Sequence, residues 1–222
     1  MSTSASTSGA VTPHVSRRDA WLLRLMSLGF GIGSFLFGLG AVLAMIGTPV
    51  PTADEIFVVG AICFTFAAAV QLLSAIQHAP TGPRLLRHVL TDPDLVSSTI
   101  QLIGTLYFNV MTVRALLLPM TEYGAVWRPD VYGSVCFLLS SWIAWHPVVR
   151  LRRYGLVITR SSVILWANML GSIFFAVSAW GATLIRPGTF ENSLWANLGT
   201  LLGAIGFLIA AVLVWPTPSE EG

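Results

Sequence analysis

Five polar side chains recur at steps of three or four residues in an otherwise apolar stretch, which places them on one face of a helix. Polar groups in hydrocarbon are costly unless they find partners, so this stripe is expected to face a bundle interior or a wet cavity. It could line a binding site for a polar solute or a lipid headgroup. We favour interhelical hydrogen bonds that fix the fold, each worth about 0.6 kcal/mol. The five residues are Ser98, Gln101, Thr105, Asn109 and Thr112.

Two histidines are candidate proton-binding or metal-binding residues. Imidazole titrates near neutral pH. His78 follows one apolar run and His146 lies near the end of another, so both are expected near the cytoplasmic interface. Neither run contains a carboxylate and no HxxxH spacing occurs, so we favour a simple interfacial position for both and predict no metal site. The polar residues that share their helices are Gln71, Ser74, Ser140 and Ser141.

Other residues that carry chemistry are missing from the sequence. No apolar run has a charged residue near its centre, although proton-coupled and ion-coupled transporters usually need one. We find no nucleophile with a base, no phosphate-binding loop and no metal cluster. Cys63 and Cys136 have no CxxC partner and are interpreted as small apolar fillers. We therefore predict neither an enzyme nor a cofactor.

The chain around these residues has the composition of a membrane protein. It is 55% hydrophobic and only 10% charged, whereas soluble domains carry about 25% charged residues. Six apolar runs have the length of about 20 residues that a helix needs to cross the bilayer, and isolated strands could not satisfy their backbone there. The runs cover residues 21–46, 56–76, 95–118, 131–149, 163–185 and 194–215. We predict an all-α integral membrane protein with six transmembrane helices in three repeated hairpins.

The distribution of arginine predicts the orientation. Nine of the 12 basic residues, all arginine, fall on one side of the predicted membrane and three on the other. The positive-inside rule then places both termini in the cytoplasm, in the plasma (inner) membrane of a bacterium. The predicted segments are a disordered tail (1–20), hairpins at 21–78, 95–149 and 163–215, cytoplasmic linkers at 79–94 and 150–162, and a final tail (216–222).

Each apolar run contains a glycine followed four residues later by a phenylalanine. Chance would give roughly one such pair in a chain with 20 Gly and 12 Phe, so the spacing indicates an internal repeat. Two GxxxG spacings, Gly29 to Gly33 and Gly199 to Gly203, also indicate close approach of helix backbones. The repeated pairs are Gly33/Phe37, Gly60/Phe64, Gly104/Phe108, Gly133/Phe137, Gly171/Phe175 and Gly203/Phe207.

The last hairpin repeats a longer pattern. Trp166-Ala167-Asn168 and Trp195-Ala196-Asn197 open its two apolar runs, which continue as Gly171-Ser172-Ile173-Phe174-Phe175 and Gly203-Ala204-Ile205-Gly206-Phe207. Over residues 166–215 this resembles the YrhK-like family of bacterial membrane proteins. The first hairpin keeps only the Gly/Ser/Phe skeleton, and the middle one departs further. The resemblance implies a membrane hairpin and no catalytic residue.

Two functions from different classes fit these observations. The first is a scaffold or accessory subunit, which acts through helix packing and contacts membrane lipids, another inner-membrane protein or a second copy of itself. The alternative is a small carrier or channel for an uncharged or lipid-like solute, lined by the stripe from Ser98 to Thr112. An acid or metal sensor built on His78 and His146 is a third possibility. The net charge of +2 is too small to predict nucleic-acid binding.

Overall fold

The computed structural model describes residues 16–47, 50–79, 91–151, 159–186, 189–190 and 192–217. The fold class is all-α, and these residues form six long helices. A one-turn helix η1 (Met120–Glu122) precedes α5, and a short antiparallel ribbon of β1 (Leu184–Arg186) and β2 (Thr189–Phe190) joins α6 to α7. The long helices are α1 (Arg17–Met45), α2 (Val50–His78), α4 (Pro93–Leu117), α5 (Gly124–Leu151), α6 (Arg160–Gly181) and α7 (Ser193–Val214).

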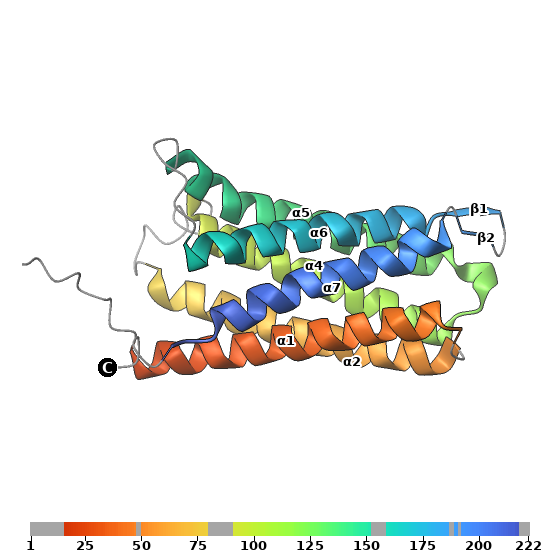
Figure 1. Ribbon diagram of the computed structural model, residues 1–222, viewed down its shortest axis with the longest axis horizontal. Coiled ribbons are helices and arrows are strands. Elements are labelled where there is room, and N and C mark those ends of the chain that lie inside the picture. The colour runs from red at the N-terminus through yellow and green to blue at the C-terminus, as the bar shows by residue number, and fades with distance from the viewer. Residues whose placement is uncertain are drawn as a thin grey trace, which may run out of the picture.

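The six helices form a closed ring in which each helix packs against two neighbours. Helices that follow one another in the chain pack together, and α7 closes the ring by packing against α1. The helices lie roughly side by side along the long axis of the molecule (Figure 1). We call the end where α1 begins and α7 ends the terminus end, and the end with β1 and β2 the ribbon end. The interior of the ring can therefore be reached only from these two ends or between helices.

Side-chain caps set the starts of helices that hydropathy alone places too late. The Ser16 hydroxyl accepts a hydrogen bond from the Asp19 backbone N–H at 3.1 Å, and α1 begins at Arg17. Residues 17–20, which we expected in a disordered tail, are therefore helical. Asp92 caps α4 in the same way, and Thr159 caps α6. The first two caps have an acidic residue in the turn that follows, where it also favours the helix dipole.

The ribbon end corrects two predicted boundaries. α6 ends at Gly181 and residues 184–186 form β1, so the expected transmembrane run to residue 185 is wrong. α5 begins at Gly124 rather than at residue 131, with Pro129 inside the helix. Proline has no N–H, so the carbonyl of Ala125 does not receive the usual helical bond from residue 129. Arg114, in the last turn of α4, donates to that carbonyl at 2.9 Å and joins the two helices.

The outside of the ring is apolar, as a lipid-facing surface must be. Among the residues that the structure describes, five helices are long and apolar enough to cross a membrane: α1, α2 from Thr52, α4, α6 and α7. Large side chains such as Phe35, Phe66 and Trp180 are at least 50% exposed on this surface. Small polar side chains are buried instead, which is typical of helices that pack in lipid. The most deeply buried of these are Ser34, Ser98, Thr105, Thr112, Ser134 and Ser172.

A cluster of six phenylalanines, one from each helix, occupies the centre of the ring. Each side chain is only 2–3% exposed. One triangle of rings, with centroids 5.6 to 6.3 Å apart, comes from α1, α4 and α6: Phe37, Phe108 and Phe175. A second triangle, with centroids 5.4 to 6.3 Å apart, comes from α2, α5 and α7: Phe64, Phe137 and Phe207. The two triangles contact each other within the helix pairs α1/α2, α4/α5 and α6/α7, at centroid distances of 5.0 to 5.6 Å.

Glycines make room for these rings. In α1/α2, α4/α5 and α6/α7 alike, a Cβ placed on the glycine of one helix would lie within 3.3 Å of the phenylalanine ring of the other. Gly29 and Gly199 also lie at close approaches, because their added Cβ atoms would meet Ala67 Cβ at 2.8 Å and Ser178 N at 2.7 Å. The six glycines that oppose the rings are Gly33, Gly60, Gly104, Gly133, Gly171 and Gly203.

Candidate functional site: two cavities separated by aromatic rings

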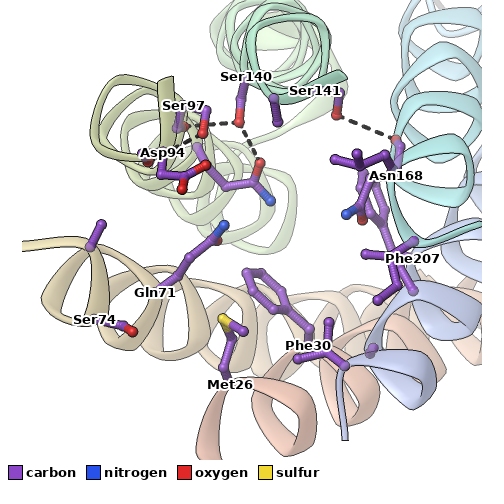
Figure 2. A pocket seen from close by; sticks show the side chains of 18 of the residues that line it. Met26, Phe30, Gln71, Ser74, Asp94, Ser97, Ser140, Ser141, Asn168 and Phe207 are labelled. Atoms are coloured by element: carbon purple, nitrogen blue, oxygen red, sulfur yellow. Dashed lines mark hydrogen bonds between the residues drawn. The ribbon is translucent and has the colours of Figure 1, made fainter. Parts of the chain in front are cut away.

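A cavity of about 360 Å³ opens at the terminus end of the ring. Its polar lining comes mainly from α2, α4 and α5. Figure 2 shows Gln71 extending from α2 into this space, opposite Ser97 and Ser140, with Phe30 and Phe207 bordering the same space. Its volume is near the lower end of the range of about 300–1,000 Å³ that is usual for small-molecule sites.

The deep wall of this terminus-end cavity contains one hydroxyl shared by two acceptors and one unpaired glutamine oxygen. Ser140 Oγ lies 2.9 Å from the Ser97 carbonyl oxygen and 2.8 Å from Gln101 Oε1, but the hydroxyl has only one hydrogen for these two acceptors. Gln71 Oε1 is buried and has no hydrogen-bond partner among the described residues. A buried acceptor without a donor costs about 1–3 kcal/mol, so this wall is incomplete by itself.

The mouth of the terminus-end cavity carries Asp92, Asp94 and His78. One oxygen of Asp92 accepts the N–H groups that begin α4, at 2.9 and 3.0 Å. His78 Nδ1 lies 2.8 Å from the Ser74 carbonyl oxygen, and its Nε2 lies 3.7 Å from the Asp19 carboxylate. The imidazole is thus hydrogen-bonded within its own helix and faces a carboxylate of α1.

His146 lies in a different environment from His78. It is exposed on α5 and packs against the Trp142 ring at a centroid distance of 6.0 Å. It does not line the cavity that includes His78. Within the described ranges, no three His, Cys, Asp or Glu side chains form a group that could hold a metal ion. The proposed pairing of the two histidines therefore has no geometric support.

A second cavity of about 300 Å³ opens at the ribbon end. It is lined by Asp54 of α2 and Asp130 of α5, together with Tyr123, Thr112 and Asn197. Burial raises the pKa of the Tyr123 phenol, and the nearby Asp130 carboxylate raises it further, so this side chain stays protonated at neutral pH. Both aspartates fall one or two residues before an apolar run, 56–76 or 131–149, and nothing in their spacing indicated that the ring would bring them to one cavity.

The expected polar stripe of α4 divides between packing and cavity lining. Ser98, Thr105 and Thr112 are buried, and each hydroxyl donates to a carbonyl of α4 itself, at 3.2, 2.8 and 3.2 Å. Asn109 donates to the Ala61 carbonyl of α2 at 3.3 Å and to the Thr65 hydroxyl. Of the stripe, only Gln101 lines the terminus-end cavity and only Thr112 the ribbon-end cavity.

The six-phenylalanine cluster lies between the two cavities. Phe207 borders the terminus-end cavity, while the triangle of Phe37, Phe108 and Phe175 borders the ribbon-end cavity. Because all six rings are almost fully buried and contact one another, the cluster closes the interior of the ring. The arrangement is a cavity with polar residues in its lining at each end and an apolar barrier in the middle.

No protein-family model matches this sequence, and neither a curated protein nor a solved structure shows significant similarity to it.

Proposed function

We propose that this chain is a multi-pass membrane protein that carries a small solute along the axis of its helix ring, with the six-phenylalanine cluster as the gate. The observation that carries this proposal is the position of the cluster, which separates two open cavities of about 360 and 300 Å³ at opposite ends. Apolar constrictions block water and polar solutes until they widen. A bundle that served only for packing would have no need of a polar cavity at either end.

The proposal includes six transmembrane spans. α5 is 28 residues long but is not among the five apolar spans, because serine, tryptophan and proline lower the hydropathy of its described part. It nevertheless packs between α4 and α6 in the ring, and its Leu139 and Trp142 are about half exposed on the outer surface. A closed ring with five helices in lipid leaves no other place for the sixth. The arginine distribution supports a bacterial inner membrane, with both ends in the cytoplasm.

We also propose that the ring arose from three related hairpins. The support is the reciprocal glycine-to-phenylalanine packing, which recurs at matching positions in α1/α2, α4/α5 and α6/α7. The YrhK-like pattern of residues 166–215 belongs to this proposal, since it covers one such hairpin. Approximate threefold symmetry gives every helix the same share of the gate, so a small outward tilt of the hairpins would widen all sides together.

Cysteine accessibility tests the proposal directly. In a background with Cys63 and Cys136 replaced by alanine, Ala75→Cys introduces a thiol into the terminus-end cavity and Ala115→Cys a thiol into the ribbon-end cavity. The control is Ala68→Cys, because Ala68 is fully buried and lines neither cavity. A charged, membrane-impermeant methanethiosulfonate is applied to vesicles from either side.

We expect the Ala75 thiol to react only from the side of the terminus end and the Ala115 thiol only from the opposite side. The Ala68 thiol should stay unreacted from both sides. The scaffold function that the sequence favoured requires no water in the ring, so protection of all three thiols would refute the carrier and support the scaffold. Purification with identification of a stable protein partner would then be the next measurement.

The gate has its own test. Phe207→Ala removes one of the six rings of the barrier. In the Ala115→Cys background, it should let the reagent reach the Ala115 thiol from the terminus end as well. Phe66→Ala is the matched control, since the Phe66 ring is 50% exposed on the outer surface of α2. Equal labelling of the two variants would show that the cluster is not the barrier. Size-exclusion chromatography checks that both remain folded, because a buried Phe→Ala change costs about 3–5 kcal/mol.

A further inference from the structure

A third hollow, of about 400 Å³, opens at the terminus end beside the last turn of α7, and we call it the arginine hollow. Arg24 of α1 and Arg160 of α6 line it, together with residues 212, 213 and 215–217. It shares no lining residue with the terminus-end cavity. α7 ends beside the beginning of α1 (Figure 1), and their packing closes the ring. A ligand in the arginine hollow would therefore contact the helices that meet at the closure.

The guanidinium group of Arg160 is held in place by the end of α7. Its Nε donates to the Leu213 carbonyl oxygen at 2.6 Å, and its Nη2 donates to the Trp215 carbonyl oxygen. Carbonyls at the end of a helix lack an N–H partner within the helix, which makes them available as acceptors. Both acceptors are neutral and a guanidinium has five N–H groups, so these two bonds orient the cation without cancelling its charge.

Arg24 brings a second positive charge to the arginine hollow. Among the described residues that line the hollow, none is Asp or Glu. Two guanidinium groups that line one space repel each other, and an anion bound between them is attracted by both. Phosphate suits such a pair, because arginine binds its oxygens through two parallel N–H bonds.

The arginine hollow borders the apolar outer surface of the ring. Val212, in the last turn of α7, lines the hollow and is 64% exposed. Trp215 also lines it and is exposed, as is Trp21 on α1. Exposed tryptophans beside an apolar surface are typical of the headgroup level of a bilayer. A molecule that has both a phosphate and acyl chains therefore fits this place better than a phosphate ion in water, because its chains can continue over Val212.

We propose that the arginine hollow binds the phosphate of an anionic phospholipid, whose acyl chains lie along the outer surface of α7. Arg24 and Arg160 bind the phosphate oxygens, and the lipid joins α1 to α6 across the end of α7. A ligand that binds only the folded state stabilises that state, so this lipid strengthens the closure of the ring. The inference rests on the membrane location of the chain but not on the passage of a solute through the ring.

Three probes test the class of ligand. Binding is measured by native mass spectrometry of the full chain in a non-ionic detergent, so that no charged bilayer surface contributes. Dioleoylphosphatidylglycerol is anionic, whereas dioleoylphosphatidylcholine has the same phosphate with a choline cation that the arginines repel. We expect saturable binding of phosphatidylglycerol, at least about tenfold tighter than that of phosphatidylcholine. Equal binding overturns the proposal, and it is the result expected if carboxylates of the chain itself fill the hollow.

Glycerol 3-phosphate is the third probe, because it has the phosphate without acyl chains. We expect it to bind at least about tenfold more weakly than phosphatidylglycerol, since it leaves the apolar border of the hollow uncovered. Binding as tight as that of the lipid would show a site for soluble phosphates and remove the phospholipid.

Two variants locate the site. Arg24→Gln and Arg160→Gln should each weaken phosphatidylglycerol binding about tenfold, since hydrogen bonds to a charged group are lost. The matched control is Arg18→Gln, the same change of charge at an exposed residue of α1 outside the hollow. Arg160→Gln also removes two bonds to α7, so Arg24→Gln decides the test if the Arg160 variant does not fold. Unchanged affinity in Arg24→Gln, or an equal loss in Arg18→Gln, would refute the site.

The lipid should also stabilise the fold. Phosphatidylglycerol should raise the melting temperature of the wild type by a few degrees relative to phosphatidylcholine. This difference should disappear in Arg24→Gln and remain in Arg18→Gln. A difference that persists in Arg24→Gln would place the stabilising lipid elsewhere and overturn the proposed role.

The outcome is separable from that of the carrier proposal. Phosphatidylglycerol binding together with protected thiols in vesicles leaves the lipid site standing and removes the carrier. Labelled thiols without a preference for the anionic lipid keep the carrier and remove the lipid site.

Discussion

Gly199 lies at a close approach of α6 and α7, and its replacement by alanine tests the packing of the ring. A Cβ there would meet Ser178 N at 2.7 Å and the Phe174 carbonyl oxygen at 2.8 Å. Both atoms belong to the backbone of α6, so no side chain can rotate away. Ordinary contact begins near 3.4 Å, and the helices must therefore separate by roughly 0.7 Å.

The expected loss of stability in Gly199→Ala follows from this separation of the helices. Overpacking in a well-packed interface costs typically about 1–3 kcal/mol, and a contact between backbones belongs at the upper end. The separation also lengthens the bonds of the Ser178 hydroxyl to the Ala196 carbonyl and to Thr200 Oγ1, now 2.5 and 2.7 Å. Alanine regains about 1 kcal/mol of helix propensity. We expect Gly199→Ala to lower the free energy of unfolding by about 1–2 kcal/mol.

Gly38→Ala is the matched control. Its added Cβ would lie 3.6 Å from Leu201 Cδ1 and 3.7 Å from Ala204 Cβ, which are ordinary contacts across the α1/α7 interface. Only the propensity gain and a little added packing remain, so this variant should be more stable than the wild type by about 0.5–1 kcal/mol. Unfolding in mixed micelles with increasing dodecyl sulfate, followed by the fluorescence of the eight tryptophans, measures both. A shift of equal sign and size in the two variants would refute this account of the interface.

Three further predictions concern polar groups. Gln71→Leu removes the unpaired buried acceptor and should raise the free energy of unfolding by about 1–3 kcal/mol in the absence of ligand. Gln77→Leu, the control on the same helix, should change it little. Equal shifts of the two variants in dodecyl sulfate titrations would contradict the unpaired state of Gln71. Asn109→Leu should lower the free energy of unfolding by about 0.6–1.7 kcal/mol, because the Asn109 side chain of α4 bonds to the Thr65 side chain of α2. A double-mutant cycle with Thr65→Val should therefore show coupling between the two changes. Strictly additive losses would argue against the bond. The fold raises the pKa of Tyr123, so the stability that its neutral phenol contributes is complete below about pH 10 and is lost at higher pH. The melting temperature of the wild type should therefore fall above about pH 10, and Tyr123→Phe should make this fall less steep. Parallel melting curves for the two proteins would contradict the raised pKa.

Much of the fold followed from local sequence. The six apolar runs predicted six long helices, because a run of about 20 apolar residues in a bilayer can satisfy its backbone only as a helix. The glycine–phenylalanine spacing marked the residues that meet at the centre. Helix ends followed less well. The boundary at Gly181 was missed because residues 182–185 are as apolar as the helix before them, so hydropathy gave no sign of the turn into β1.

The candidate site was predicted only in part. The steps of three and four residues identified Gln101 and Thr112 as inward-facing, since helical periodicity fixes a face. They could not tell these two from Ser98 and Thr105, whose hydroxyls bond to carbonyls of their own helix. Whether a polar residue on one face meets a neighbour or a cavity depends on how the adjacent helices are spaced.

The sequence by itself determined that the chain forms long helices around its apolar runs, their apolar outer surface and the positions of the glycines and phenylalanines, because these depend on neighbours within a turn or two of helix. Only the tertiary structure decided that Asp54 and Asp130 line one cavity, that Gln71 and Gln101 line another, and that six rings close the space between them. Residues so far apart in the chain become neighbours through closure of the ring, when α7 packs against α1. Closure is a property of all six helices together, and no segment of the chain contains it.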